Sequence, residues 1–166
     1  MSGNEGKANP DQYRGVWVFA EQRDGELRNV SLELLGKGRE LADTLGVELT
    51  AILLGENMDE KCQELISYGA DSVIFGDDPR LKRYQTSVYT DIITDQIRKY
   101  GPEIIIMGAT YLGRDLAPRI ARRIGTGLTA DCTDLEIDRK LRLLVQTRPA
   151  FGGNVIASII TPNHRP

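Results

Sequence analysis

Residues 103–115 read EIIIMGATYLGRD, in which a short run of strongly apolar residues passes into a turn of small residues. A continuous apolar run is typical of a parallel strand whose two faces are both covered by helices. The run predicts a strand over Glu103–Met107, followed by a turn into a helix. Pro118 suits the first turn of that helix, where its missing N–H group needs no partner. The stretch indicates an α/β fold.

The same alternation of strand and helix occupies the preceding residues. Apolar residues recur at helical spacing between Arg28 and Gly46, and Gly46 is typical of a helix C-terminus. The predicted elements are, in chain order, strand 16–20, helix 28–46, strand 49–54, helix 59–68, strand 72–75 and helix 88–97. Helical crossovers between strands imply parallel pairing with helices on both faces, so we predict a doubly wound, mainly parallel sheet of Rossmann type.

The last third of the chain follows a different pattern. Apolar and polar residues alternate over Cys132–Asp138 and Leu141–Arg148, which predicts a β-hairpin, and Val155–Ile160 predicts one further strand. We expect one domain over residues 13–161. Residues 1–12 are expected to be a disordered leader, because they offer almost nothing to bury, and residues 162–166 the start of an interdomain linker.

Length, net charge and the apolar segments exclude several classes of protein. The 166 residues suit a single core, and a net charge of -3 argues against nucleic acid, whose binding domains carry a basic excess. No apolar segment has the length of a secretion signal or a membrane span, so we expect a soluble protein of the cytoplasm. Cys62 and Cys132 are expected to be buried free thiols, although the sequence leaves a disulfide between them open.

The turn after the strand at 103–107 is the first candidate site. Ligands of open parallel sheets bind beyond the carboxyl ends of the strands, and Gly108 begins such a turn. Its backbone N–H groups and the following helix end would accept a phosphate, although such glycines are often only turns. The four arginines of the next helix favour a solvated face, and Arg119 is alternatively suited to pair with a carboxylate of a partner subunit.

Two later stretches, GTGLTAD over 125–131 and RPAFGGN over 148–154, combine glycines with polar side chains. The candidate residues there are Thr126, Thr129, Asp131, Arg148, Gly152, Gly153 and Asn154. Charge, close backbone approach and hydrogen bonding together suit a ligand site. An ordinary turn with an exposed arginine fits the second stretch equally well.

Residue sets typical of catalysis are largely missing from the sequence. His164 is the only histidine and lies in the predicted linker, which argues against a histidine-based triad, metal site or general base. The phosphate-binding and nucleophile-elbow motifs of common enzymes are absent as well, and so is a carboxylate cluster with metal spacing. We therefore predict no independent catalytic site and no metal site.

Three blocks of the sequence resemble the α subunit of electron transfer flavoproteins. They read GATYLGRDLAPR over 108–119, TGLTADC over 126–132 and RPAFGGN over 148–154. The likeness extends over about residues 14–166, and three blocks in order are far more specific than one. The resemblance implies an N-terminal domain of the adenine-nucleotide hydrolase-like fold, while the family's FAD-holding domain would begin where this chain ends.

The resemblance also implies partners and cofactors. The domain would pack on a β subunit to form a heterodimer that uses FAD to carry electrons from an acyl-CoA dehydrogenase or another flavin dehydrogenase. The β subunit would hold AMP or, in electron-bifurcating members, a second FAD. This domain is not expected to bind FAD stably alone.

Residue roles follow from the same resemblance. Arg148 would stabilise an anionic flavin through its charge. Gly152, Gly153 and Asn154 would let the backbone approach the flavin ring, and Thr126, Thr129 and Asp131 would orient that loop.

Two other functions remain as alternatives. A free-standing nucleotide-binding module of the universal-stress-protein kind shares this sheet, but its phosphate loop expects a glycine where Tyr111 stands. A nucleotide hydrolase or ligase of the same superfamily would need a Ser-Gly-Gly-x-Asp-Ser loop, which the sequence lacks.

Overall fold

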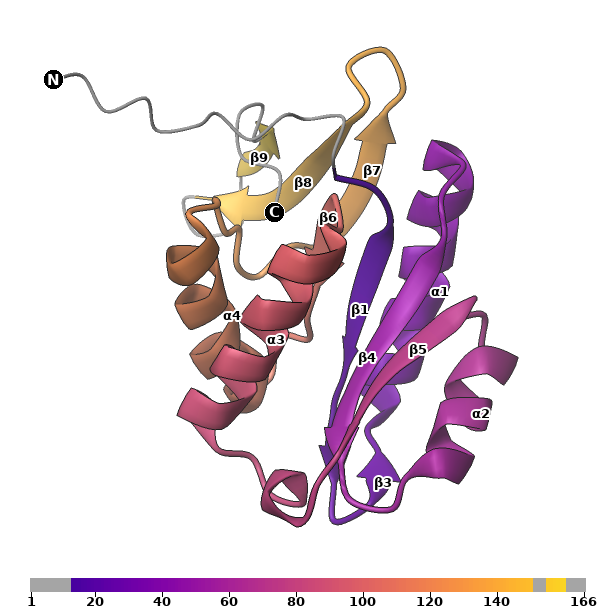
Figure 1. Cartoon of the computed structure of the whole chain (residues 1–166). Helices are drawn as coiled ribbons and strands as arrows, with labels where there is room; N and C mark the ends of the chain where they lie inside the picture. Colours follow the sequence, from indigo (N-terminus) through magenta and orange to yellow (C-terminus); the bar gives the residue numbers. More distant parts are fainter. Residues whose placement is uncertain (1–12, 151–154, 161–166) are drawn as a thin grey trace, which may run out of the picture.

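The computed structural model describes residues 13–150 and 155–160 and shows an α/β domain with a second, smaller sheet (Figure 1). In chain order its elements are β1 (Val16–Ala20), β2 (Gln22–Arg23), β3 (Glu26–Leu27), α1 (Asn29–Leu45), β4 (Leu49–Gly55), α2 (Asp59–Ser67), β5 (Ser72–Asp77), the 3-10 turn η2 (Pro79–Leu81), α3 (Thr86–Tyr100), β6 (Ile104–Ile106), α4 (Tyr111–Ile124), β7 (Asp134–Asp138), β8 (Leu143–Ala150) and β9 (Val155–Ile160). The predicted leader, the predicted linker and Gly152, Gly153 and Asn154 lie outside the described residues.

Four parallel strands form the central sheet in the order β5-β4-β1-β6. The chain builds outward from β1 to β4 and β5, then crosses back to place β6 on the other side of β1. Helices α1 and α2 cover one face of the sheet, and α3 and α4 cover the other (Figure 1). The prediction of a doubly wound, mainly parallel sheet is confirmed.

Strand β1 is the centre of the core, and all five of its residues are buried. Its side chains alternate between the two faces, as the pleat of a strand requires. Val16, Val18 and Ala20 join the apolar cluster on the side of α1, while Trp17 and Phe19 join the cluster packed against α3 and α4. Helices cover both faces of the sheet, and this explains why β1 is apolar at every position.

The start of α4 differs from the prediction. The helix begins at Tyr111, directly after the turn, because the Thr110 side chain caps it by accepting a hydrogen bond from the Gly113 N–H at 3.0 Å. Pro118 therefore lies in the interior of the helix and not in its first turn. Pro118 is exposed, so the helical hydrogen bond that its missing N–H cannot form is lost on the solvent-facing side of α4.

The sequence analysis missed a two-stranded hairpin between β1 and α1. Strands β2 and β3 pair antiparallel across Asp24 and Gly25, which adopt φ values of 52° and 83°. An Asp-Gly pair with both residues at positive φ is the preferred sequence for such a two-residue turn. The Asp-Gly dipeptide could have predicted the turn, but strand-like apolar runs, which make such a prediction convincing, do not directly flank it.

Strands β7, β8 and β9 form a separate antiparallel sheet, which confirms the predicted hairpin and the further strand. Arg148 belongs to β8, as predicted, and lies opposite Ala157 of β9, but the strand continues to Ala150, so the predicted turn over 148–154 does not begin at Arg148. Arg142 fastens this sheet to the main one. Its guanidinium donates to the Leu45 carbonyl at 2.9 Å and to the buried Glu103 carboxylate at 3.1 Å.

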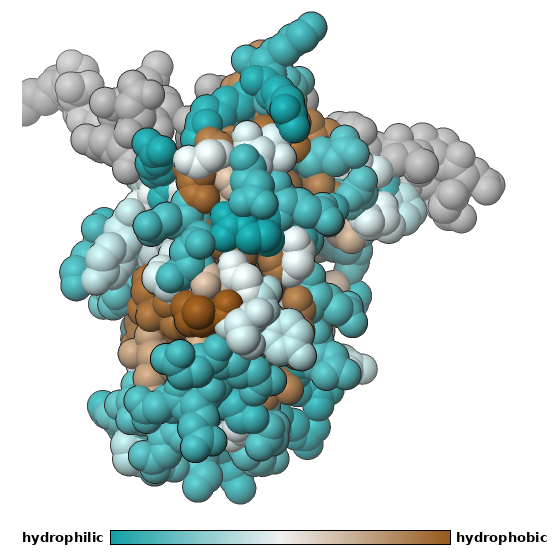
Figure 2. Space-filling model, turned by 90° about the vertical axis from the view of Figure 1, so that its right-hand side faces the viewer, coloured by the Kyte–Doolittle hydropathy of each residue, from teal (hydrophilic) through white to brown (hydrophobic). Residues whose placement is uncertain are grey.

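The surface on the side of α1 and α2 is mostly hydrophilic, with an apolar area near its middle (Figure 2). Pairs such as Lys37–Glu40 and Arg39–Asp43 join neighbours along α1. Exposed pairs of this kind contribute little to stability individually. No helix within the described residues combines the length and apolarity needed to cross a membrane.

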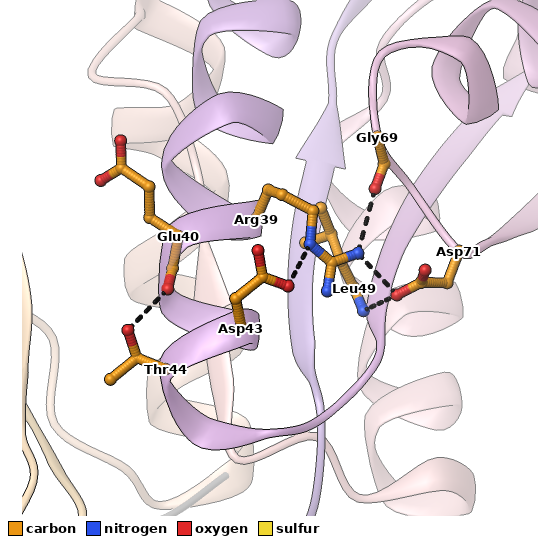
Figure 3. Close-up of polar contacts among 7 residues, drawn as sticks. All are labelled: Arg39, Glu40, Asp43, Thr44, Leu49, Gly69 and Asp71. Atoms are coloured by element: carbon orange, nitrogen blue, oxygen red, sulfur yellow. Dashed lines mark hydrogen bonds and ion pairs between the residues drawn. The ribbon is translucent and has the colours of Figure 1, made fainter.

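Arg39 ties three parts of the chain together on this side (Figure 3). Its guanidinium donates to Asp71 at 2.8 Å and to the Gly69 carbonyl at 3.3 Å, while the Asp71 carboxylate also accepts from the Leu49 N–H at 2.8 Å. The Leu49 N–H and the Arg39 guanidinium hold the pKa of Asp71 below its ordinary value. The network joins α1, the start of β4 and the turn before β5.

Replacing Asp71 with Asn should flatten the acid limb of the stability profile. A carboxyl whose folded-state pKa is depressed stabilises the fold above its unfolded pKa, about 3.9, and that contribution is lost as pH falls through the lower folded pKa. Urea unfolding at pH 7 and at pH 3 should show a smaller difference for Asp71→Asn than for the wild type. Asp43→Asn, at the more exposed contact of Arg39, is the control for losing a carboxylate beside Arg39, and it should destabilise the fold at pH 7 less than Asp71→Asn does.

Candidate functional site

A cavity of about 480 Å³ runs along the open side of β6. Residues 104–107 line it from the sheet, Val30 and Leu34 from α1, Ala117 and Ile124 from α4, and the segment 126–132 lies across from β6. Within the described residues, β6 has β1 as its one hydrogen-bonded neighbour. The cavity therefore occupies the position where a further strand would extend the sheet, with a helix over each face.

The charged groups of this cavity are paired with one another. Arg114 donates to Asp131 at 2.8 Å, and Arg142 pairs with Glu103, whose side chain is only 3% exposed. The remaining lining is largely aliphatic. Because these opposite charges already neutralise each other, the cavity suits an apolar occupant better than a phosphate group.

Of the five predicted site residues that the structure describes, four line this cavity. Gly108, Thr126, Thr129 and Asp131 all line it. The Arg114–Asp131 pair links the segment after α4 to the first turn of that helix. Asp131 adopts φ 55°, a left-handed conformation that Asp tolerates better than most residues.

Arg148 lies beside the cavity and does not line it. Its exposed side chain shares a face of β8 with Leu144 and Gln146, two residues that do line the cavity. Burial raises the pKa of the nearby Cys132 thiol, and the charge of Arg148 opposes that rise. Arg148 is thus within electrostatic reach of Cys132 and provides an exposed positive charge at the edge of the cavity.

The arginines of α4 pair largely within the domain. Arg119 lies 3.3 Å from Asp115 one turn earlier, and Arg123 pairs with Asp91 of α3. The solvated-face interpretation fits these contacts. Arg119 therefore already has a carboxylate partner inside its own helix.

Asp115 is a structural residue that the sequence analysis missed. It accepts hydrogen bonds from the hydroxyl groups of Tyr84 and Thr86, both at 2.7 Å. Burial, with the adjacent Asp115 carboxylate, raises the pKa of Tyr84 to about 12. These bonds join Thr86 at the start of α3, and Tyr84 just before it, to α4. No short sequence pattern predicts such a contact.

Glu21 is a second residue without a sequence signal. It directly follows β1, is 5% exposed, and accepts a hydrogen bond from the Thr110 hydroxyl at 2.5 Å. A methyl group on Gly108 would lie 3.2 Å from the Glu21 carboxylate and 2.9 Å from a Val30 methyl. Gly108 is therefore required for close packing between β6 and α1.

Cys62 and Cys132 are free and only partly buried, so the expectation of free thiols is confirmed and that of full burial is wrong. Among residues 13–150 and 155–160, no group of three His, Cys, Asp or Glu side chains is placed to hold a metal ion.

The fold and the cavity define a Rossmann-type α/β domain with an open sheet edge. A family profile described as "Electron transfer flavoprotein domain" matches residues 16–166. The chain belongs to the electron transfer flavoprotein family, as the resemblance implies.

Several curated proteins with electron-transfer names are similar to the chain. The chain is 58% identical over 158 residues to "Electron transfer flavoprotein subunit alpha" of Clostridium acetobutylicum, with 95% of this chain and 47% of the relative covered. It is 54% identical to "Protein FixB" of Clostridium saccharobutylicum (93% and 46% covered) and 44% identical to "Acryloyl-CoA reductase electron transfer subunit beta" of Anaerotignum propionicum (96% and 49%). The chain spans about half the length of these relatives, and it matches their N-terminal part.

Replacing Gly113 with Ala should destabilise the domain by about 2 kcal/mol or more, the range expected when a packed site is overfilled. The added methyl group would lie 1.9 Å from the Gly108 carbonyl oxygen, which belongs to the backbone and cannot turn aside. Gly36→Ala in α1 is the matched control, because nothing lies within 4 Å of its added methyl group. Thermal unfolding should show Gly36→Ala unchanged or stabilised by up to about 1 kcal/mol; equal effects of the two changes would contradict the packing argument.

Proposed function

We propose that this chain acts as the N-terminal domain of an electron transfer flavoprotein α subunit, which packs against a β subunit and helps to form a flavin or nucleotide site. The observation that carries the proposal is the apolar cavity along the open side of β6. An apolar strand edge left uncovered is prone to aggregation, and proteins normally cover it. The cavity is therefore suited to burial within a larger assembly.

The occupant that best fits the cavity is an extended polypeptide segment of that assembly. The free side of β6 offers backbone hydrogen bonds, and pockets of alternating aliphatic side chains lie above and below it, which is the arrangement used in strand addition. The paired charges of Arg114 with Asp131 and of Arg142 with Glu103 leave little for a free ion to bind. In this proposal the cavity is a packing surface.

The cofactor would lie at the edge of the cavity. The exposed Arg148 guanidinium and the polar groups of Thr126, Thr129 and Asp131 fit a ring system that carries negative charge when reduced. The flavin would supply the uptake and release of electrons. Arg148 would hold a positive charge near it, and the polar groups of 126–131 would position the adjacent backbone.

The remaining parts of the proposal concern the complete protein. FAD would be held mostly by other parts of the complex, and AMP or a second FAD by the β subunit, while an acyl-CoA dehydrogenase or another flavin dehydrogenase would supply electrons. The domain would be part of a redox carrier, without catalytic chemistry of its own. Its two free cysteines suit a reducing compartment such as the cytoplasm.

Replacing Ala117 with Arg should weaken assembly while leaving the domain folded. Ala117 lines the cavity from α4, so a long charged side chain would project into the space that the partner segment needs. Coexpression with the β subunit, followed by size-exclusion chromatography, should show at least tenfold weaker association, equivalent to about 1.4 kcal/mol. Arg122→Ala, on the exposed surface of the same helix, should assemble like the wild type; normal assembly of Ala117→Arg would remove the cavity from the interface.

Replacing Arg148 with Ala in the complete α/β complex should lower the flavin midpoint potential, because a positive charge stabilises the more negative, reduced flavin. A shift on the order of 30 mV corresponds to about 1.4 kcal/mol for a two-electron couple. Redox titration followed by absorbance is the measurement, with Arg148→Lys as the charge-conserving control. An unchanged potential and spectrum in Arg148→Ala would exclude Arg148 from the flavin site.

A further inference from the structure

The crevice between β1 and β6 has the general features of an anion site. The strand order reverses there, and nucleotides bind at such points in related sheets. A hollow of about 270 Å³ opens beside it, lined by residues 27–30 and Thr110. The amino ends of α1 and α4 both border this hollow, and the exposed Arg28 contributes a positive charge.

The two helices leave their positive ends without an acidic residue of their own. The first turn of α1 contains no Asp or Glu, and the same holds for the first turn of α4. Arg28, at the start of α1, makes no capping hydrogen bond through its side chain. A negative charge placed between these two helix ends would therefore be stabilised by both of them.

Glu21 places a carboxylate behind this hollow, against Thr110 and Gly108. It is 5% exposed and accepts the Thr110 hydroxyl hydrogen bond at 2.5 Å. Its backbone is fixed as well, since its N–H donates to the Ser31 hydroxyl at 2.7 Å and its carbonyl accepts from the Arg28 N–H at 2.9 Å. The backbone of Glu21 is thus held at two points, and its buried carboxylate is held by the Thr110 hydroxyl.

The Thr110 hydroxyl connects the carboxylate to α4. It donates to Glu21 and accepts from the Gly113 N–H at 3.0 Å, so one of the donors that an incoming phosphate would use is already engaged. Gly108 closes the other side of the crevice against Val30.

We propose that the Glu21 carboxylate serves as a built-in anion that fills the nucleotide position of this fold and excludes phosphate groups from it. The domain then keeps the architecture of a nucleotide-binding fold while rejecting nucleotides at its own strand ends. This inference concerns the 166-residue chain by itself and does not depend on its assembly with a partner.

The test is isothermal titration of the wild type and of Glu21→Gln with AMP and with inorganic phosphate. Glu21→Gln keeps the shape and the hydrogen-bond acceptor but removes the charge, and Glu21→Ala also opens space. We expect no measurable binding by the wild type at millimolar ligand and at least tenfold tighter binding by Glu21→Gln. Inorganic phosphate should compete with AMP, which identifies the phosphate as the recognised group.

Two controls make the result specific. Glu33→Gln removes a charge from an exposed position on α1 and should bind no better than the wild type. Adding Arg28→Ala to Glu21→Gln should weaken the new binding, since Arg28 lines the hollow. Circular dichroism identifies which variants are folded. Equal binding by wild type and folded Glu21 variants, or no binding by any of them, would overturn the proposal.

Discussion

The rest of the site depends on the close approach of Gly113 to the carbonyl of Gly108, which lets α4 begin at the Thr110 cap. A methyl group at Gly113 would lie 1.9 Å from that carbonyl oxygen, so only glycine allows the helix to start directly after β6. Thr110 can then cap the helix and reach Glu21 in the same geometry. From this start, Arg114 meets Asp131 and Asp115 meets Tyr84 and Thr86.

A second constraint is the way the antiparallel sheet is attached. Arg142 and Glu103 fasten the β7–β8 hairpin at the amino end of β6, and Lys37 pairs with Asp134 at 3.4 Å on the side of α1. These contacts hold the small sheet near β6 without pairing the two sheets along their edges. Leu135, Ile137 and Leu144 of the small sheet also pack against the core cluster on the side of α1. The space that remains is the cavity, and the edge of β6 beside it stays open.

Most of the fold follows from the sequence because its signals are local. Continuous apolar strands and glycines after helices predict the alternation of elements, and the structure confirms it. The errors arise where a single contact overrides a general rule. Pro118 suits a first turn by propensity, but the Thr110 cap starts the helix seven residues earlier. Glu21 and Asp115 look like ordinary acidic residues in the sequence, because their partners lie far away along the chain. Glu21 contacts a residue 89 positions away, and Asp115 contacts residues 29 and 31 positions away.

The same fold can serve either to bind a nucleotide or to support one bound elsewhere, and local electrostatics decide between the two. Helix amino ends favour a negative charge whatever its source. When a side chain of the same domain provides that charge, the stabilisation is gained on folding and no ligand is needed to obtain it. In a domain stabilised in this way, the helix amino ends already have their negative charge, while the edge strand β6 still lacks a second hydrogen-bonded neighbour among the described residues. Its open interactions are then apolar and directional, because the free side of β6 offers backbone donors and acceptors beside a largely aliphatic cavity.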